Sequence, residues 1–459
     1  MGAAAFGNLT FSFSEVRILL YCNKQMILWG KGEIKFMGTV NDLIINEKIP
    51  AMLKVHQNFC SERIADFEKK FREELLREAV ISTIRPGMRI VITAGSREID
   101  HLSDAVRILG EMIRERGAAP FVIPAMGSHG GATAEGQRAI LAGYGITEER
   151  TGVPVHASMD VDVLARLDDG KPVYTDSFAH AADGIIVLNR IKAHTGFRAP
   201  YESGLIKMMA VGLGKQKGAE IIHSYGPQFL GSVVETVGKK VLSCAKILFG
   251  VGLVENAYDK TFAVRCLMPE EILSEEPKLL ELSKSLMPKL YFENLDVLIV
   301  DQIGKNISGS GMDPNITKSF NYFTGMSREG RAKKIVVMDL SEETHGCAIG
   351  IGAADITTRR LVEKMDTEAT YPNALTSCET ESPCIPMFFD SQKLAVKAAI
   401  KTLPGTDKDH LRIVRIKDTL HMGDIEISEE LLREAEENPD VQILSRPAPW
   451  EFNENGDLF

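Results

Sequence analysis

Two short apolar runs, separated by an amphipathic segment, constrain the fold of this chain most strongly. The runs are GMRIVITAG (87–95) and PFVIPA (120–125). Between them, apolar residues recur at helical spacing from Ser103, which can cap a helix, to Gly117, which can end one. A strand–helix–strand unit of this kind makes its two strands parallel, joined by a right-handed crossover. The sequence therefore predicts an α/β fold built on parallel sheets.

Further apolar runs of strand length follow in two groups. DGIIVLN (183–189) and AKILFGVGLV (245–254) indicate buried strands of the first sheet. LDVLIVDQIGKN (295–306) and AKKIVVMDL (332–340) begin a second α/β series, with helical patterns after them. We therefore expect two α/β domains with parallel or mixed sheets flanked by helices. The active site is expected in the cleft between the domains, where loops leave the carboxyl ends of strands.

The same pattern sets the expected domain boundaries. It begins at about Met37, so residues 1–36 are expected to lie outside the fold, as the product of an upstream start. Residues 37–269 form the expected N-terminal domain and residues 291–459 the C-terminal domain. Between them, residues 270–290 are polar and helical in pattern, which predicts a connector.

Charge and composition exclude several classes of function. The net charge is −10 and no block of Lys and Arg stands out, so the clustered basic face that binds nucleic acid is missing. No apolar run reaches the roughly 18 residues of a membrane span. The seven cysteines are scattered without a C-x-x-C pair, which fits a reduced cytoplasm better than a disulfide framework. We expect a cytoplasmic protein that binds a small molecule, with its oligomeric state left open.

Polar residues at the expected strand ends are the first candidates for chemistry. TAGSRE places Ser96 and Arg97 after a strand, where the guanidinium can bind a carboxylate or phosphate; a surface ion pair is the alternative. GSHGG places His129 in a glycine turn that leaves its ring uncovered; a surface histidine is the alternative. The loop DQIGKNISGSGMDPN carries Gln302 and Lys305 at its head. All three loops follow strands, where open α/β sheets bind ligands.

A glycine-rich stretch, residues 188–226, holds the remaining candidates, His194, Lys207 and His223. Glycine at this density suits a backbone that approaches a ligand closely. Lys207 lies in the apolar piece SGLIKMMAVG, where desolvation would lower its pKa and make it a nucleophile or attachment point. A lysine that extends its ammonium into water is the alternative. The nearby GLGKQKG has the wrong spacing for a dinucleotide loop.

The order and spacing of four motifs resemble those of the lactate racemase family, the nickel-pincer nucleotide enzymes. The motifs are PAMGSHGGATAEGQ, KAHTGF, GLIKMMAVGLGKQKGA and IIHSYG. The resemblance covers most of the chain from about Met37 and is closest to a divergent branch of the family. It implies a nickel ion held by pyridinium-3-thioamide-5-thiocarboxylic acid mononucleotide through carbon and two sulfurs, bound by the N-terminal domain.

The resemblance also implies roles for the residues of the glycine-rich segments. Lys207 matches the lysine that is joined to the cofactor, and His223, sixteen residues later, matches the nickel ligand. His129 and His194 match two acid/base histidines on opposite faces of the substrate. Whether the cofactor is covalently attached in this chain stays open.

The anion-binding candidates match the family with departures. Arg97 matches the arginine that closes the family's cofactor loop, with Ser96 beside it, and it is also expected to bind substrate. Gln302 and Lys305 match a pair near the substrate carboxylate. The aspartate of the family loop falls on Ala94, and the histidine turn reads Ser-His-Gly-Gly rather than Thr-His-Arg-Pro. These changes line the substrate side, so we expect a substrate other than lactate.

The chain is thus expected to be an isomerase, a nickel-dependent racemase or epimerase of a 2-hydroxy acid, with a sugar acid as one candidate. Hydride removal leaves a planar keto acid that can take the hydride back on either face, and one base per face serves the hydroxyl proton. The loops SGSGMDPN and THGCAIGIGAAD are expected to select the substrate. Two alternatives stay open, a nicotinamide-dependent dehydrogenase and a non-catalytic protein that binds the cofactor or a metabolite.

Overall fold

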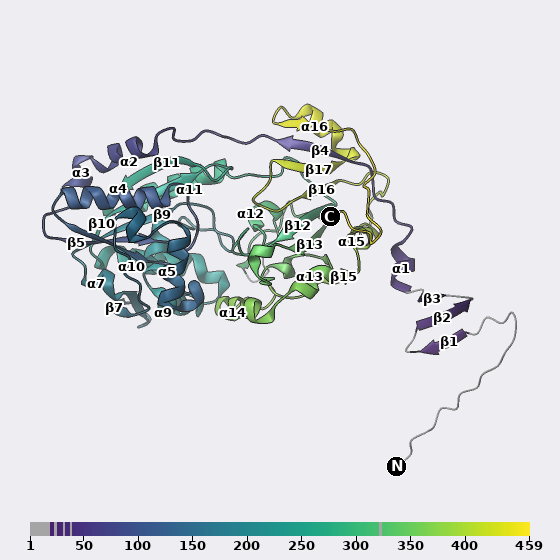
Figure 1. Cartoon of the computed structure of the whole chain (residues 1–459), viewed down its shortest axis with the longest axis horizontal. Coiled ribbons are helices and arrows are strands. Elements are labelled where there is room, and N and C mark those ends of the chain that lie inside the picture. Colours follow the sequence, from purple (N-terminus) through teal and green to yellow (C-terminus); the bar gives the residue numbers. More distant parts are fainter. Residues whose placement is uncertain (1–18, 23–24, 31–32, 37–38, 321–323) are drawn as a thin grey trace, which may run out of the picture.

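The protein consists of two α/β lobes side by side, seen in a computed structural model that describes residues 19–22, 25–30, 33–36, 39–320 and 324–459 (Figure 1). Each lobe is built on its own sheet with helices packed on both faces. This confirms the predicted fold class of parallel or mixed sheets flanked by helices. No helix among the described residues is long and apolar enough to cross a membrane.

The first sheet has five strands in the order β11-β10-β9-β5-β6. Its strands are β5 (Arg89–Ala94), β6 (Ala119–Pro124), β9 (Gly184–Arg190), β10 (Ile247–Glu255) and β11 (Thr261–Leu267). Neighbours are parallel except β11, which is antiparallel to β10. The predicted strand–helix–strand unit is confirmed, since α4 (Leu102–Glu115) joins the parallel strands β5 and β6. The buried Val106, Leu109 and Ile113 pack α4 into the core of the sheet.

Helices cover both faces of this first sheet. On one face α2 (Phe67–Leu75) lies beside α4. On the other face lie α8 (Leu205–Lys207), α9 (Lys215–His223) and α10 (Leu230–Cys244). The segment predicted as a connector, residues 270–290, is mostly one helix, α11 (Pro269–Leu286), which packs against β10.

The second sheet has eight strands in the order β15-β14-β13-β12-β16-β17-β4-β18. Its strands are β4 (Met52–Gln57), β12 (Val297–Ile303), β13 (Lys334–Leu340), β14 (Ile356–Thr358), β15 (Met387–Phe389), β16 (Ile413–Ile416), β17 (Asp424–Ser428) and β18 (Val441–Ile443). From β15 to β16 the strands are parallel, and the last three are antiparallel to their neighbours. α13 (Arg359–Lys364) and α15 (Gln392–Lys401) cover its opposite faces.

Strand β4 corrects the predicted domain boundary. It pairs with β17 and β18 in the second sheet, and its Leu53 and Val55 are buried in the core of that sheet. The helix before it, α1 (Thr39–Ile44), packs near α15 of the same lobe. Residues 39–57 therefore belong with the second lobe, not with the predicted domain 37–269, because the buried side chains of β4 complete the second core.

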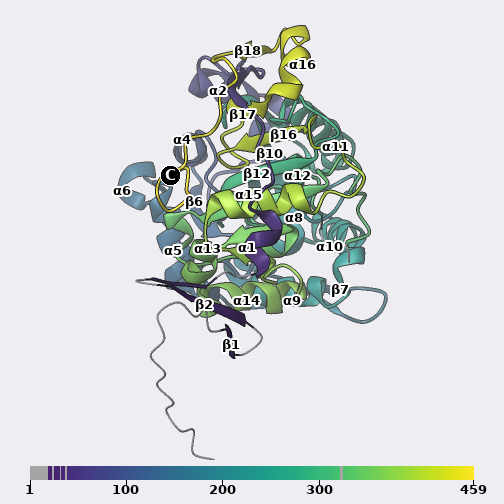
Figure 2. The ribbon, with the colours of Figure 1, turned by 90° about the vertical axis from the view of Figure 1, so that its right-hand side faces the viewer.

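The prediction that residues 1–36 lie outside the fold falls largely on residues that the structure does not describe. The described pieces are β1 (Leu19–Cys22), β2 (Gln25–Gly30) and β3 (Glu33–Phe36). They pair antiparallel as a separate three-stranded sheet. Figure 1 shows this sheet beyond α1 and to one side of both lobes, and in Figure 2 it lies at their lower edge.

Candidate active site

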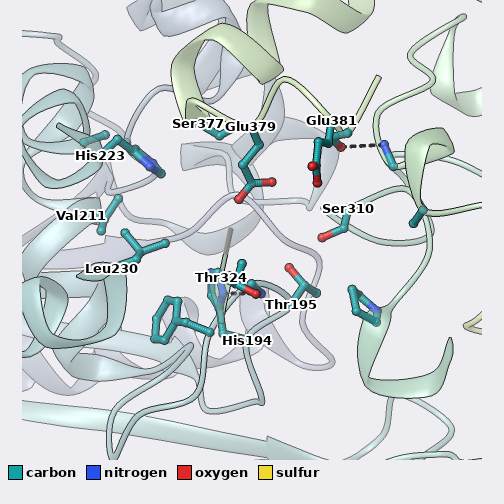
Figure 3. A pocket seen from close by; sticks show the side chains of 18 of the residues that line it. His194, Thr195, Val211, His223, Leu230, Ser310, Thr324, Ser377, Glu379 and Glu381 are labelled. Atoms are coloured by element: carbon teal, nitrogen blue, oxygen red, sulfur yellow. Dashed lines mark hydrogen bonds between the residues drawn. The ribbon is translucent and has the colours of Figure 1, made fainter. Parts of the chain in front are cut away.

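A cavity of about 250 Å³ lies between the two lobes, and loops from both lobes line it. The first lobe contributes His129, His194, Lys207 and His223, four of the residues that the sequence singled out. The second lobe contributes mainly hydroxyl and carboxylate side chains: Ser310, Thr324, Ser377, Glu379, Glu381 and Ser382. Figure 3 shows the two walls facing one another, with Glu379 directed into the space between His223 and His194. Both lobes therefore contribute side chains to one cavity, whose size suits a small molecule.

The imidazole of His129 is arranged as a hydrogen-bond acceptor toward the cavity. Its Nδ1 donates a hydrogen bond to the carbonyl of Met126 (2.7 Å), because a carbonyl oxygen can only accept. The neutral ring therefore keeps its lone pair on Nε2. His129 is exposed toward the cavity, and its pKa is lowered to about 4, mainly because the surrounding groups desolvate the ring. The hydrogen bond to Met126 opposes this shift, and the positive charges of Arg97, Lys305 and Lys207 contribute to it.

The turn around His129 needs its glycines, as predicted. Gly127 and Gly130 have φ values of +61° and +67°, in the left-handed region where glycine is favoured. A Cβ at Gly130 would also lie 2.6 Å from the backbone nitrogen of Gln137. The turn is therefore both left-handed and tightly packed, which holds the backbone of His129 close to the start of the next helix.

His194 is arranged in the opposite way. Its Nδ1 accepts a hydrogen bond from the backbone N–H of Gly196 (2.9 Å), so the neutral ring carries its proton on Nε2. The ring stacks on Phe197 with centroids 4.1 Å apart, and burial is the main cause that holds the pKa of His194 well below its usual value. Of the two histidines, His129 can thus accept a proton at Nε2, and His194 can donate a hydrogen bond from Nε2–H.

Lys207 is half-buried, and its amine has no counter-ion in the part of the chain that the structure describes. Its Nζ forms no hydrogen bond or ion pair with any described residue, and burial, helped by the charge of Arg97, lowers its pKa to about 8. It ends α8 at the point where the chain enters a π-helical segment, η2 (Met208–Gly212). Such π-helical turns occur often at functional sites. A Cβ at Gly212 would lie 2.6 Å from the carbonyl oxygen of Ala125, so this glycine allows η2 to pack against the end of β6.

His223 is the last residue of α9 and also lines the cavity. Its imidazole forms no hydrogen bond with the described residues. Burial, followed by the charge of Lys207, lowers the pKa of His223, so the ring is neutral and able to bind a metal ion. Within the described ranges, no group of three or more His, Cys, Asp or Glu side chains could hold a metal ion.

A buried carboxyl group that the sequence did not indicate holds the start of the helix that carries Lys207. Glu276 of α11 accepts a hydrogen bond from the backbone N–H of Ile206 (3.0 Å), at the start of α8. Gly204 makes room for this carboxyl group, since a Cβ there would lie 2.0 Å from its Oε1. Burial raises the pKa of Glu276 to about 8. The folded protein therefore keeps this group protonated at neutral pH.

We expect the free energy of unfolding to decrease as pH rises from 4.5 to about 8. The Glu276→Gln variant should lack the part of this decrease that comes from Glu276. In this window the folded state holds a proton on Glu276 that the unfolded state has released. Rising pH therefore favours unfolding, by up to about 5 kcal/mol over the window. Denaturant midpoints at the two ends of the window measure the effect, with the exposed Glu281→Gln as the control. Equal pH dependence in wild type and Glu276→Gln would contradict the assignment.

Arg97 and Lys305 lie beside the cavity rather than on its wall. Nη1 of Arg97 donates a hydrogen bond to the carbonyl of Lys305 (3.0 Å), which joins the loops after β5 and β12 across the cleft. Nζ of Lys305 donates to the side-chain oxygen of Asn373 (2.6 Å). Neither cation forms an ion pair with a described residue, and burial lowers the pKa of both. Two unneutralised cations next to His129 favour binding of an anion.

Ser96 and Gln302 are not brought to the cavity wall. The carbonyl of Ser96 accepts a hydrogen bond from the hydroxyl of Tyr144 (2.9 Å), and the backbone N–H of Gln302 donates to Lys417 O (2.9 Å). The side chains of Ser96 and Gln302 form no hydrogen bond with described residues. Their predicted roles in cofactor and substrate binding therefore stay predictions.

The loop after α14 (Thr367–Ser377) supplies cavity residues that the sequence did not indicate. Glu379 and Glu381 belong to it, and Figure 3 shows both side chains on the cavity wall. The loop is tied to the predicted substrate-selecting segment, since Gly350 N–H donates to the carbonyl (3.0 Å) and the hydroxyl (2.9 Å) of Ser382. The only available signal was this neighbouring segment, THGCAIGIGAAD, which contributes Gly350 to the same wall.

Fold and site together define an α/β protein with a cavity between two lobes that is lined by histidines and a lysine. No family model and no curated protein matches the sequence. Among solved structures, the chain is similar to the lactate racemase apoprotein from Thermoanaerobacterium thermosaccharolyticum, at 13% identity, 85% of this chain, 97% of that chain and a TM-score of 0.45. A protein from Thermotoga maritima is similar at 16% identity, 59% of this chain, 70% of that chain and a TM-score of 0.43. Similarity at this level assigns no activity to this chain.

Proposed function

We propose that this protein is a racemase or epimerase of a 2-hydroxy acid that uses a nickel-pincer nucleotide. The observation that carries the proposal is the convergence of His129, His194, Lys207 and His223 on one cavity. His129 is exposed and Lys207 is half-buried, and both side chains line this cavity. Four chemically active side chains from separate segments, none with a counter-ion among the described residues, suit a reaction better than a purely structural role.

The residues present fit the cofactor that the sequence resemblance implies. Lys207 is an amine with a pKa of about 8, so roughly a tenth of it is neutral at pH 7 and can condense with a thio-acid group, which forms a thioamide and releases water. His223 offers a neutral imidazole, the single ligand that nickel needs from the protein when the nucleotide supplies carbon and two sulfurs. When bound, the cofactor would supply a hydride acceptor. Ser96 and Arg97 are the proposed residues for its phosphate.

Proton transfer to and from the substrate hydroxyl falls to the two histidines. For one enantiomer, Nε2 of His129 accepts the hydroxyl proton and returns it to the same oxygen after the hydride has come back, while Nε2–H of His194 donates a hydrogen bond to that oxygen. For the other enantiomer His194 is the proposed base, which requires its ring to carry the proton on Nδ1 and to release the hydrogen bond from Gly196. The opposite hydrogen-bonding states of the two rings support the assignment for the first enantiomer, because one is set to accept and the other to donate.

The substrate carboxylate is proposed to bind near Arg97 and Lys305, with Gln302 assisting. Both cations are half-buried and lack a carboxylate partner among the described residues, so binding an anion would relieve part of the cost of their desolvation. Holding the carboxylate in this way leaves the α-carbon and its hydroxyl group toward the histidines, in one geometry for both enantiomers.

The second lobe favours a substrate larger than lactate, such as a sugar acid. Glu381 and Ser310 present hydrogen-bond acceptors on the wall opposite the histidines, and Arg328 and Glu379 of the same wall have partners of their own. Carboxylate and hydroxyl oxygens accept hydrogen bonds from hydroxyl groups. A chain of hydroxyl groups beyond the α-carbon therefore suits this wall better than a methyl group.

We expect Glu381→Gln to lower kcat/KM for a sugar acid by about 10-fold or more while leaving a small hydroxy acid such as lactate unaffected. The reason is that a hydrogen bond to a charged acceptor contributes about 1.5–3 kcal/mol, and only the longer substrate can form it. Turnover of both acids by the loaded enzyme measures the ratio. Glu368→Gln, an exposed residue on the first turn of α14, is the control. An equal loss for both acids would argue against a hydroxyl-binding wall.

The reaction itself is tested with an α-deuterated hydroxy acid in ordinary water. If the hydride is removed and returned, the inverted product keeps its deuterium. Loss of deuterium to water would indicate proton abstraction at carbon and would contradict the proposed chemistry. Conversion that requires added nicotinamide nucleotide would instead support the dehydrogenase alternative.

A further inference from the structure

We propose that Lys215, Asp176 and Gln137 form a buried network that positions the His129 turn relative to the helix that ends in His223. None of the three lines the cavity, so they act through other groups and are positioning residues. The kinetic part of the test below rests on the proposed function, and the structural part does not.

The centre of the network is a fully buried ion pair. Nζ of Lys215, the first residue of α9, lies 3.0 Å from Oδ2 of Asp176, and both side chains are 0% exposed. Asp176 ends β8 (Pro172–Asp176), and its other oxygen accepts two backbone N–H groups at the start of α7 (Ser177–Ala181). A buried pair of charges is stable only where hydrogen bonds satisfy both ions. For the ammonium, those further bonds lead to the His129 turn.

Lys215 reaches this turn by two routes. Its Nζ donates directly to the carbonyl of Pro124, where β6 ends, and also to Oε1 of Gln137 at 3.4 Å. The amide nitrogen of Gln137 in turn donates to the carbonyls of Gly127 (2.9 Å) and His129 (3.2 Å). One buried charge thus holds three carbonyls of the turn and its approach, through hydrogen bonds that polarise one another.

The backbone at Lys215 indicates that the surroundings impose this arrangement. Lys215 has a φ of +53°, in the left-handed region that a lysine rarely adopts. Such a conformation persists only where neighbouring structure determines it. The preceding Gly214 is also tightly packed, since a Cβ there would lie 3.0 Å from the carbonyl oxygen of Ala210. GLGKQKG, which only resembles a dinucleotide loop, therefore forms a tight turn that supplies a buried cation.

Helix α9 connects this network to the other groups of the site. It begins at Lys215 and ends at His223, and it follows closely on the π-helical segment after Lys207. A shift of the His129 turn relative to α9 would change the distances from His129 to His223 and to Lys207. Hydrogen bonds to backbone carbonyls resist such a shift because they are directional, which apolar packing is not.

The direct test is amide hydrogen exchange on the chain prepared without cofactor, comparing wild type with Gln137→Met. This variant keeps the approximate side-chain volume and removes the donors to the turn, so exchange in residues 126–133 should rise about 10-fold or more. Gln216→Met, at an exposed position on α9, is the matched control and should leave that peptide unchanged. Unchanged exchange in Gln137→Met would overturn the proposal. A rise spread evenly over β5 and β10 would also overturn it, because it would indicate only lost stability.

A second variant, Lys215→Met combined with Asp176→Asn, decides the matter if Gln137→Met does not fold. It removes both charges together, so no unpaired ion is left buried, and the same local rise in exchange is expected. In the loaded enzyme, either variant should lower kcat about 10-fold or more, with nickel content and KM near the wild-type values. If the wild type shows no racemase activity, the proposed function fails, whereas the exchange result still decides the network.

Discussion

Replacement of His129 by alanine is expected to lower kcat for racemisation by at least about 100-fold while nickel and cofactor contents stay at the wild-type level. The reason is that a positioned general base contributes about 10²–10⁴ in rate, and no other described side chain replaces Nε2 of His129 at this part of the wall. The ring is not a proposed ligand or attachment point of the cofactor, so loading should not depend on it.

The measurement for His129→Ala is turnover in both directions, normalised to nickel content. His180→Ala is the matched control, because His180 is an exposed histidine of the same lobe, paired with Asp162 at 3.1 Å. Normal turnover by His129→Ala would refute the acid/base assignment. Loss of nickel together with loss of activity would show instead that His129 belongs to the cofactor site.

Replacement of Lys207 by alanine is expected to abolish both the covalent mass increment and the activity. Its amine has no counter-ion among the described residues, and its pKa of about 8 makes it reactive near neutral pH. Lys207→Arg should fail as well, since a guanidinium keeps the positive charge but is not a nucleophile at this pH.

Intact mass after denaturation measures the attachment. Lys217→Ala is the matched control, because Lys217 is an exposed lysine of α9 and should leave the increment in place. An increment that persists in Lys207→Ala would place the attachment elsewhere. If the wild type binds nickel without any increment, the cofactor is held non-covalently, and Lys207 is then an electrostatic rather than a covalent partner.

The candidates that directly follow a strand differ in where the structure places them. His129 after β6 lines the cavity, whereas Arg97 after β5 lies beside it. Parallel strands of one sheet present their carboxyl ends at the same edge, which a local pattern can predict. Lys207 was a candidate from its apolar surroundings, and the family resemblance supplied its expected role.

Long-range pairings explain what the sequence could not predict. β4 joins β17 across most of the chain length, and no local pattern specifies that partner. The acidic residues of the cavity, Glu379 and Glu381, lie on a loop that accepts hydrogen bonds at Ser382 from the backbone N–H groups of Gly350, 32 residues earlier in the chain, and of Gly352. Glu276 looked like one charge in a polar helix, and its burial depends on how α11 packs under α8.

The hydrogen-bonding states of the site residues could not be predicted from the sequence, because they depend on contacts in the folded protein. The opposite arrangement of His129 and His194 depends on whether Nδ1 meets a carbonyl or a backbone N–H. The buried pair of Lys215 and Asp176 could not be inferred either, because a lysine in a glycine-rich segment is usually solvated.

The central claim is tested most directly by the intact mass and nickel content of wild-type protein made in cells that also synthesise the pincer nucleotide. Our account predicts a mass increment on the peptide that carries Lys207, with about one nickel ion per chain. Protein that carries neither the increment nor nickel would contradict it and would leave a protein that binds a metabolite in the cavity between its lobes.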